Sequence, residues 1–155
     1  MNSDLKYKEA FEALLSYCNY QERCSSEVIQ KLKDLELDSS KKEQILNDLI
    51  ESNIVNDERF TAAFISGKVR IKRWGRNKIR AALRAKHISE NIIVLGFDDV
   101  IQADEYNDQL ELLFTRKWSL LKNKKDHSTR GKIFRFLYGK GYESELINKL
   151  FVKYF

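Results

Sequence analysis

The chain has 155 residues, of which 43% are hydrophobic and 33% are charged, and its net charge at pH 7 is +5. A chain of this length makes one domain or two very small ones, and its apolar content excludes a disordered tail. No apolar run approaches the roughly 20 residues that a membrane-crossing helix needs, and the first residues lack a signal-peptide pattern. We therefore expect a cytoplasmic protein with no membrane segment, and the absence of proline favours helix throughout.

The first third of the chain has the periodicity of three amphipathic helices. An apolar stripe predicts the first helix over residues 5–20. Ser25 or Ser26 is placed to cap the second helix. Ser40 precedes Glu43 by three residues, which is the spacing of a capping box and predicts the start of the third helix.

The middle third predicts three more helices. Asn56 or Asp57 can cap the fourth helix, which Gly75 ends. A short fifth helix follows, and Ser89 can cap the sixth. The fourth helix carries an apolar stripe that we expect to be buried, made of Phe60, Ala63, Phe64, Gly67, Ile71 and Trp74.

The last third again predicts three helices. A long helix is expected over about residues 102–122, and Ser128 or Thr129 can cap the next one. Gly139 and Gly141 then mark a turn before the last helix. No stretch alternates as a strand would, so the sequence predicts an all-α fold with nine helices.

A short motif recurs in the three thirds of the chain. EVIQKL at 27–32 aligns with KIRAAL at 78–83 and with KIFRFL at 132–137, at spacings of 51 and 54 residues. A turn and another capped helix follow each motif. The pattern predicts three tandem three-helix repeats in an elongated, curved array, right-handed or solenoid-like. The expected repeats are residues 1–55, residues 56–101, which are basic, and residues 102–155.

The charge is arranged in blocks. Residues 60–89 contain nine basic residues and no acidic one, and residues 116–140 contain nine basic residues and one acidic one. Between them, residues 90–115 contain seven acidic residues and no basic one. A basic block is often only a solvated surface, but like charges repel, and a polyanion or an acidic protein surface would relieve that repulsion. The acidic block can also neutralise part of the charge within the molecule.

The sequence offers little for catalysis or metal binding. His87 and His127 have no cysteine or paired carboxylates at ligand spacing, and Cys18 and Cys24 lie on or near helix stripes, as buried thiols do. YGKGY at 138–142 lacks the spacer and the Ser/Thr of a P-loop and predicts a helix end. We therefore expect a protein that is not an enzyme and has no cofactor and no metal.

Two residues allow two interpretations each. Trp74 can pack between helices, or it can stack on a base or anchor a partner. Asp57 can cap the fourth helix, or it can contact a partner. Phe136 is the aromatic residue whose burial is least certain, because it lies two positions from Phe134 on the same helix.

The segment from 49 to 88, LIESNIVNDERFTAAFISGKVRIKRWGRNKIRAALRAKHI, resembles the central segment of the RecX family, the regulators of RecA recombinase. Residues 22–32 and 132–150 are similar to that family's opening and closing units. His87 stands where the family prefers Gly, and Arg76 stands where many members have Pro. The residues of the central segment that match the family pattern are Leu49, Ile54, Asp57, Arg59, Phe60, Gly75, Ile79, Leu83, Lys86 and Ile88.

The resemblance implies three three-helix units that lie in the groove of the RecA filament on DNA. Such a protein limits filament growth or promotes disassembly, and so restrains strand exchange, RecA ATP hydrolysis and the SOS response. The implied partners are the RecA filament and single- or double-stranded DNA, and the implied state is a monomer.

The two basic blocks supply the residues that we expect to meet the filament through charge rather than through base readout. The competing hypothesis is a helix-turn-helix transcription factor, whose recognition helix would begin at Arg76 and Asn77. A nuclease would need a carboxylate pair facing a basic groove, and no spacing supports one. The expected binding residues are Lys68, Arg70, Lys72, Arg73, Arg76, Lys78, Arg80, Arg84, Lys122, Lys124, Lys125, Arg130, Lys132 and Arg135.

Overall fold

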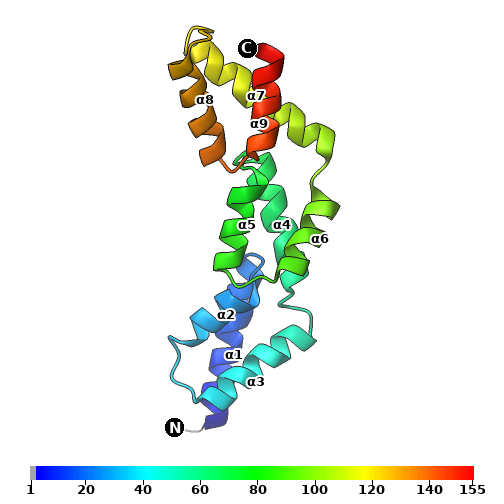
Figure 1. Cartoon of the computed structure of the whole chain (residues 1–155). Helices are drawn as coiled ribbons and strands as arrows, with labels where there is room; N and C mark the ends of the chain where they lie inside the picture. Colours follow the sequence, from blue (N-terminus) through cyan, green and yellow to red (C-terminus); the bar gives the residue numbers. More distant parts are fainter. Residues whose placement is uncertain (1–2) are drawn as a thin grey trace.

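In the computed structural model, which describes residues 3–155, the chain forms an elongated array of helices with its two ends far apart (Figure 1). The middle helix of each successive triplet (α2, α5 and α8) lies along the same side of the array (Figure 1). The prediction of an all-α fold of three tandem three-helix repeats is therefore confirmed for the described residues. The helices are α1 (Ser3–Tyr20), α2 (Ser25–Leu32), α3 (Ser39–Glu51), α4 (Asp57–Arg70), α5 (Arg76–Ala85), α6 (Glu90–Val100), α7 (Ala103–Leu120), α8 (His127–Gly139) and α9 (Ser144–Tyr154).

We refer below to α1–α3, α4–α6 and α7–α9 as the first, second and third units. The predicted boundaries at 55 and 101 fall in the connections between α3 and α4 and between α6 and α7. These boundaries stay a prediction, because the helices show where the connections lie and not where one folding unit ends.

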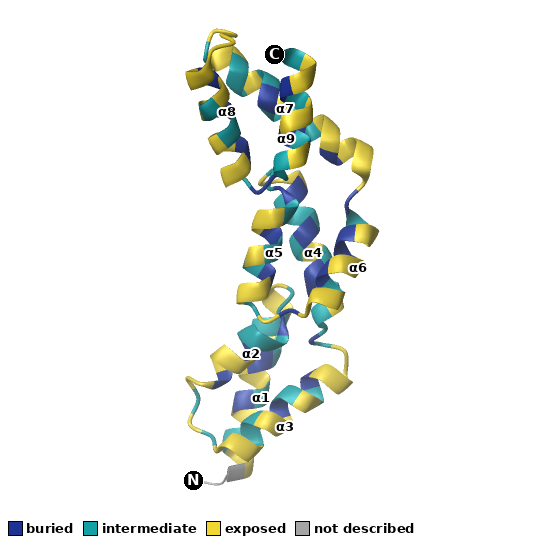
Figure 2. Cartoon of the chain, in the orientation of Figure 1, coloured by how far each residue is buried: buried dark blue, intermediate teal, exposed yellow. Residues whose placement is uncertain are grey.

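The buried side chains form two clusters. The first unit has its own core, in which Leu14, Val28, Ile45 and Leu49 are fully buried. The second and third units share one continuous cluster, which also takes in Cys24 from the first unit. Buried residues consequently run along the inner sides of the helices through the whole upper part of the array (Figure 2). The second and third units are thus bound together by hydrophobic burial, and the first is attached mainly by other means.

Helix α4 buries a different face from the predicted one. Thr61, Ile65 and Val69 are buried, and the helix packs on α6 at Gly96. A side chain at Gly96 would begin 2.7 Å from Ile65 Cδ1, so the glycine allows the two helices to approach closely. Of the predicted stripe Phe60, Phe64 and Trp74 pack on the core, whereas Ala63 is exposed and Ile71 is 79% exposed. The burial prediction for this stripe is therefore wrong in part, because α4 has two apolar faces and α6 covers the other one.

The helix starts are partly as predicted. Asn56 caps α4, where its side chain accepts a hydrogen bond from the Arg59 N–H, and Ser89 caps α6. The other predicted N-caps lie one to three residues after the observed ones. Ionised Asp38 and Asp126 accept stronger hydrogen bonds from the first turn than a serine or threonine hydroxyl does. The observed N-caps are Cys24 in place of Ser25 or Ser26, Asp38 in place of Ser40, and Asp126 in place of Ser128 or Thr129.

The same turn follows α5 and α8. The Ile88 N–H donates to the Leu83 carbonyl at 3.1 Å, and 54 residues later the Tyr142 N–H donates to the Leu137 carbonyl at 3.2 Å. The residue before each of these donors has a positive φ, 61° at His87 and 100° at Gly141. This backbone conformation explains why glycine suits the position that His87 occupies.

Candidate polyanion-binding surface

Three arginines of the central basic block are paired with the acidic block of the same chain. Arg80 and Arg84 both lie 3.0 Å from carboxylate oxygens of Glu90, and Arg70 Nε lies 3.4 Å from Glu105 Oε1. These pairs are partly exposed, so each stabilises the fold only slightly. The acidic residues 90–115 therefore neutralise part of the central block, and these three guanidinium groups are engaged within the chain in this structure. Their contact with a partner stays a prediction.

Arg76 is held inside the molecule. Its Nη1 lies 2.8 Å from Glu143 Oε2, and its guanidinium lies 4.2 Å from the centre of the Tyr106 ring. The Tyr106 hydroxyl accepts the Arg76 N–H at 3.0 Å and donates to Glu143. Burial, together with the bond to Glu143, raises the pKa of Tyr106 above its ordinary value. Arg76 thus joins the second and third units and does not face an external partner.

Four of the five remaining cations of the central block lie near Trp74, and the fifth, Lys86, pairs with Glu27. Lys68 Nζ and Lys78 Nζ lie 4.6 and 4.4 Å from the centre of the Trp74 ring, and Lys72 and Arg73 directly precede that residue. Among residues 3–155, no ion pair involves any of these four cations. Trp74 is partly buried against the shared core. The ring therefore packs between helices and holds two ammonium groups, which leaves little of it open for base stacking.

The third unit adds Lys140 to this group. Lys140 Nζ donates to the Lys72 carbonyl at 3.3 Å. Burial, together with the charges of Lys78 and Arg73, lowers the pKa of Lys140 below its ordinary value. Burial is the larger cause of this shift, and the two neighbouring cations add to it. We name Lys68, Lys72, Arg73, Lys78 and Lys140, with Trp74, the Trp74 cluster.

Alternating lysines and aromatic rings extend the cluster along α8 and α7. Lys140 Nζ and Lys117 Nζ lie 5.9 and 4.9 Å from the centre of the Phe136 ring, which is partly exposed. At the other end, Lys68 Nζ lies 5.2 Å from the Phe64 ring. Neither Lys117 nor Lys140 is among the binding residues that the sequence predicts. The sequence does contain a signal for Lys140, because this residue occupies the same position of the repeat as Lys86 in the central basic block.

The predicted residues of the last basic block are not gathered around Trp74. The connection between α7 and α8 lies at the end of α8 that points away from α5 (Figure 1). It is separated from Lys140 by the 13 residues of α8, or about 20 Å at 1.5 Å per residue. Lys122, Lys124 and Lys125 belong to this connection, and Arg130, Lys132 and Arg135 follow along α8.

Two protein-family models match the sequence of this chain. The model of the second three-helix domain of RecX matches residues 56–94, and the model of the third matches residues 104–151. Together they take in more than half of the chain. The chain belongs to the RecX family.

Curated relatives agree with this assignment. Regulatory protein RecX of Clostridium perfringens (strain 13 / Type A) is 32% identical over 130 residues, which are 83% of this chain and 60% of that protein. Regulatory protein RecX of Chlorobium phaeobacteroides (strain BS1) is 28% identical and is covered over 94% of its length. The chain thus spans about three fifths of the clostridial relative and nearly all of the other.

Solved structures share the fold. The crystal structure of RecX from Lactobacillus salivarius has a TM-score of 0.86 and 21% sequence identity, with 96% of each chain covered. A second crystal structure of regulatory protein RecX has a TM-score of 0.84 and 21% identity, with 97% of this chain and 73% of that one covered. At this identity the likeness concerns the fold alone.

The start of α5 in this RecX family chain does not suit a recognition helix. The Gly75 N–H donates to the Lys140 carbonyl at 2.8 Å, and the Asn77 N–H donates to the Gly141 carbonyl at 2.9 Å. A recognition helix presents its N-terminal residues to base edges. Here the third unit covers that end and Arg76 is paired with Glu143, which argues against the helix-turn-helix hypothesis.

The described residues offer no metal site and no activated thiol. Within residues 3–155 no group of three or more His, Cys, Asp or Glu side chains could hold an ion, and no described helix is long and apolar enough to span a membrane. Cys24 is buried and Cys18 is partly buried, and burial raises the pKa of both thiols. Both therefore stay protonated at neutral pH.

Proposed function

We propose that this chain regulates RecA recombinase, mainly as an inhibitor, by binding the RecA–DNA filament and limiting its growth. It catalyses no reaction of its own in this proposal and acts in the cytoplasm, where it restrains RecA ATP hydrolysis, recombination and the SOS response. Membership of the RecX family supports the proposal, since the curated relatives are regulatory proteins.

The Trp74 cluster is the observation that carries the proposal. Five cations from two units lie close together without a carboxylate partner among residues 3–155. Burial lowers the pKa of Lys140, and the charges of Lys78 and Arg73 lower it further. A polyanion would replace the repulsion between these cations with attraction and release its own counterions. The filament supplies such a polyanion in its DNA phosphates.

The composition of the cluster favours positioning contacts over sequence readout. Four of its five cations are lysines, which act as point charges without the planar fork that arginine offers to a base. Three of the four paired arginines of the central basic block, Arg76, Arg80 and Arg84, lie on α5, so the groups best suited to base recognition are already engaged within the chain. We therefore expect salt-dependent binding with little preference for DNA sequence.

The test follows ATP hydrolysis by RecA assembled on single-stranded DNA. We expect inhibition at a protein concentration well below that of RecA, because one molecule that blocks filament growth affects many RecA subunits. The triple variant Arg73→Glu, Lys78→Glu, Lys140→Glu should need at least tenfold more protein for the same inhibition. No inhibition by the wild-type protein at an equimolar concentration would defeat the proposal.

A matched variant separates the cluster from general charge. Lys122→Glu, Lys124→Glu, Lys125→Glu makes the same change in net charge at the far end of α8. We expect this variant to keep most of its inhibition, with a change of threefold or less. An equal loss in both triple variants would show that net charge and not the Trp74 cluster drives binding.

A further inference from the structure

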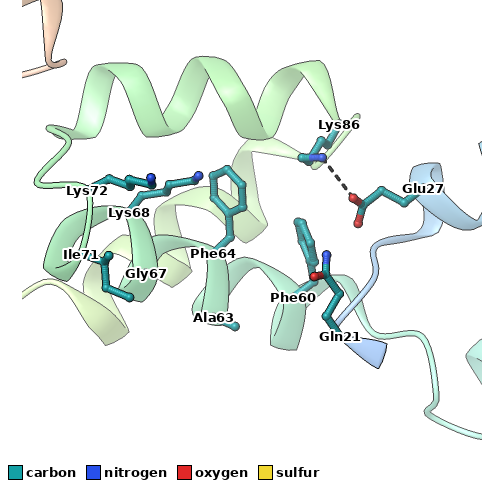
Figure 3. Close-up of a pocket in the computed structure, with 10 residues that line it drawn as sticks. All are labelled: Gln21, Glu27, Phe60, Ala63, Phe64, Gly67, Lys68, Ile71, Lys72 and Lys86. Carbon is teal, nitrogen blue, oxygen red and sulfur yellow. Dashed lines mark hydrogen bonds and ion pairs between the residues drawn. The ribbon is translucent and has the colours of Figure 1, made fainter. Parts of the chain in front are cut away.

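Helix α4 has a second apolar face that the rest of residues 3–155 covers only in part. It is the stripe that the sequence predicted to be buried, and it lines a groove of about 350 Å³ (Figure 3). The opposite face of α4 is occupied by α6. On this face Phe60 is buried and Phe64 packs partly against the core, whereas Ile71 is 79% exposed. The apolar residues that line this α4 groove are Phe60, Ala63, Phe64, Gly67 and Ile71.

Lysines border the α4 groove. Lys68 and Lys72 extend over it in the same direction, beside the Phe64 ring (Figure 3). Lys86 closes the other end, where it pairs with Glu27 at 3.2 Å. Since that pair cancels one charge of each sign, the groove keeps an excess of two positive charges at its border.

We propose that the α4 groove binds a short acidic segment of a partner protein. Apolar side chains of the segment would lie on Phe64 and Ile71, and its carboxylates would pair with Lys68 and Lys72. Gly67 leaves open space in the middle of the groove, because nothing lies within 4 Å of the position that a Cβ would take there. The groove is thus apolar in its floor and cationic at its border, which complements an amphipathic acidic peptide.

The aromatic rings favour a peptide over a nucleic acid here. Single-stranded nucleic acids bind by stacking bases on free aromatic faces. In the α4 groove an ammonium group lies over each ring, Lys68 at 5.2 Å from the Phe64 centre and Lys86 at 6.0 Å from the Phe60 centre. A stacking base would have to displace these ammonium groups, whereas a carboxylate would pair with them where they lie.

Filling the groove is the sharpest test. Gly67→Leu places a side chain in open space on a helix, so it blocks the groove without a clash and without removing a charge. Gly139→Leu is a matched control, because Gly139 also lies in a helix and has nothing within 4 Å of its Cβ position. Gly67→Ala is a second control that leaves most of the groove open.

The probe is a fluorescein-labelled 12-residue peptide that alternates glutamate with leucine and phenylalanine, and binding is followed by fluorescence anisotropy. We expect the wild-type chain to bind it and Gly67→Leu to weaken binding at least tenfold, while both controls stay within twofold. Circular dichroism should show the same helical content in all variants.

Two results would overturn this inference. One is that the wild-type chain does not bind the acidic peptide, or that Gly67→Leu leaves its affinity unchanged. The other is that Gly67→Leu abolishes binding of a labelled 12-nucleotide oligo-dT and spares the peptide, which would assign the groove to nucleic acid. Lys68 and Lys72 belong to both the groove and the Trp74 cluster. The proposed RecA regulation is still tested separately, because these measurements contain no RecA and the triple variant that tests it changes Arg73, Lys78 and Lys140, none of which lines the groove.

Discussion

The two junctions between units join equivalent elements of the repeat with different chemistry. At each junction, the start of a middle helix meets the turn after the middle helix of the next unit. Ser26 Oγ donates to the Lys86 carbonyl at 2.6 Å at the first junction, and the Gly75 N–H donates to the Lys140 carbonyl at 2.8 Å at the second. The repeat is therefore present in the contacts between units as well as in the units themselves.

The first turn of each middle helix is also capped by the following unit. The Ser25 N–H donates to Asp57 Oδ1 at 2.7 Å, and the corresponding Arg76 N–H donates to the Tyr106 hydroxyl at 3.0 Å. Asp57 thus caps α2 and not α4, the helix that it begins. A cap supplied by another unit ties local helix stability to the assembly of the array.

The two junctions differ in how closely the backbones approach. At the second, a Cβ on Gly75 would lie well under 3.0 Å from the backbone of Gly141 and Tyr142, and the Tyr142 side chain is fully buried. The first junction relies on partly exposed ion pairs, such as Arg59 with Glu22 at 2.7 Å. The comparison indicates that close backbone packing and a shared core join the second and third units, and that the first unit is held by interactions that single substitutions can loosen.

The largest expected effect breaks the close approach at the second junction. Gly75→Ala introduces a methyl group that only a backbone shift can accommodate, because the atoms that it meets belong to the main chain. We expect the free energy of unfolding to fall by about 3 kcal/mol. Urea unfolding, followed by circular dichroism, measures it.

The control for this substitution is Gly139→Ala. Its added Cβ meets nothing within 4 Å, and alanine is the better helix former, so stability should stay level or rise by about 0.5 kcal/mol. Equal destabilisation by both substitutions would mean that the packing of Gly75 on Gly141 has no special part in joining the units.

A smaller effect is expected at the first junction. Asp57→Ala removes the carboxylate that caps α2 and should lower the free energy of unfolding by about 1–2 kcal/mol. Hydrogen exchange should accelerate in α2 and stay unchanged at the start of α4, which Asn56 still caps. Faster exchange in α4 instead would show that Asp57 acts on its own helix, and Glu58→Ala, at an exposed neighbouring position, serves as the control.

The sequence predicted most of the fold because helix periodicity and the spacing of the repeat are local properties. It failed on the orientation of α4, where two apolar stripes compete and hydropathy alone does not choose between them. Ile65 and Val69 win because Gly96, far along the chain, lets α6 approach them. The glycine in the predicted sixth helix is the feature of the sequence that indicates which face of the fourth helix is covered.

The candidate site was predictable only in part for the same reason. Lys68 and Lys78 could be selected from local charge, and the structure places both beside Trp74. The pairing of Arg76 depends on Glu143, which is 67 residues away. Contacts across such separations decide which cations remain available, and one sequence does not specify them.

A third substitution makes the first junction more like the second. His87 is exposed and has a φ of 61°, in the position that Gly141 occupies in the next unit. His87→Gly relieves backbone strain, and after the entropy that glycine adds to the unfolded state we expect a gain of about 0.5 kcal/mol. His87→Ala retains the Cβ and should give no gain, so equal melting temperatures for the two variants would contradict the strain argument.

The smallest effect concerns the lysines that end the two equivalent turns. Lys86 pairs with Glu27 at 3.2 Å, whereas Lys140 meets Lys78 and Arg73. Lys86→Gln should therefore lower stability and Lys140→Gln should raise it, each by about 0.3 kcal/mol, because both groups are partly solvated.

The two substitutions, Lys86→Gln and Lys140→Gln, should change stability in opposite directions, and this difference in sign is what the experiment tests. The lowered pKa of Lys140 means that its charged form is disfavoured in the folded state, so the gain from Lys140→Gln is complete at pH 7. It should shrink as the pH rises past the ordinary pKa of a lysine, where the side chain is neutral in both states. Melting temperatures at low ionic strength measure both variants, and added salt should bring the two curves together. A loss of stability from Lys140→Gln at pH 7 would mean that its hydrogen bond to the Lys72 carbonyl outweighs the repulsion within the Trp74 cluster.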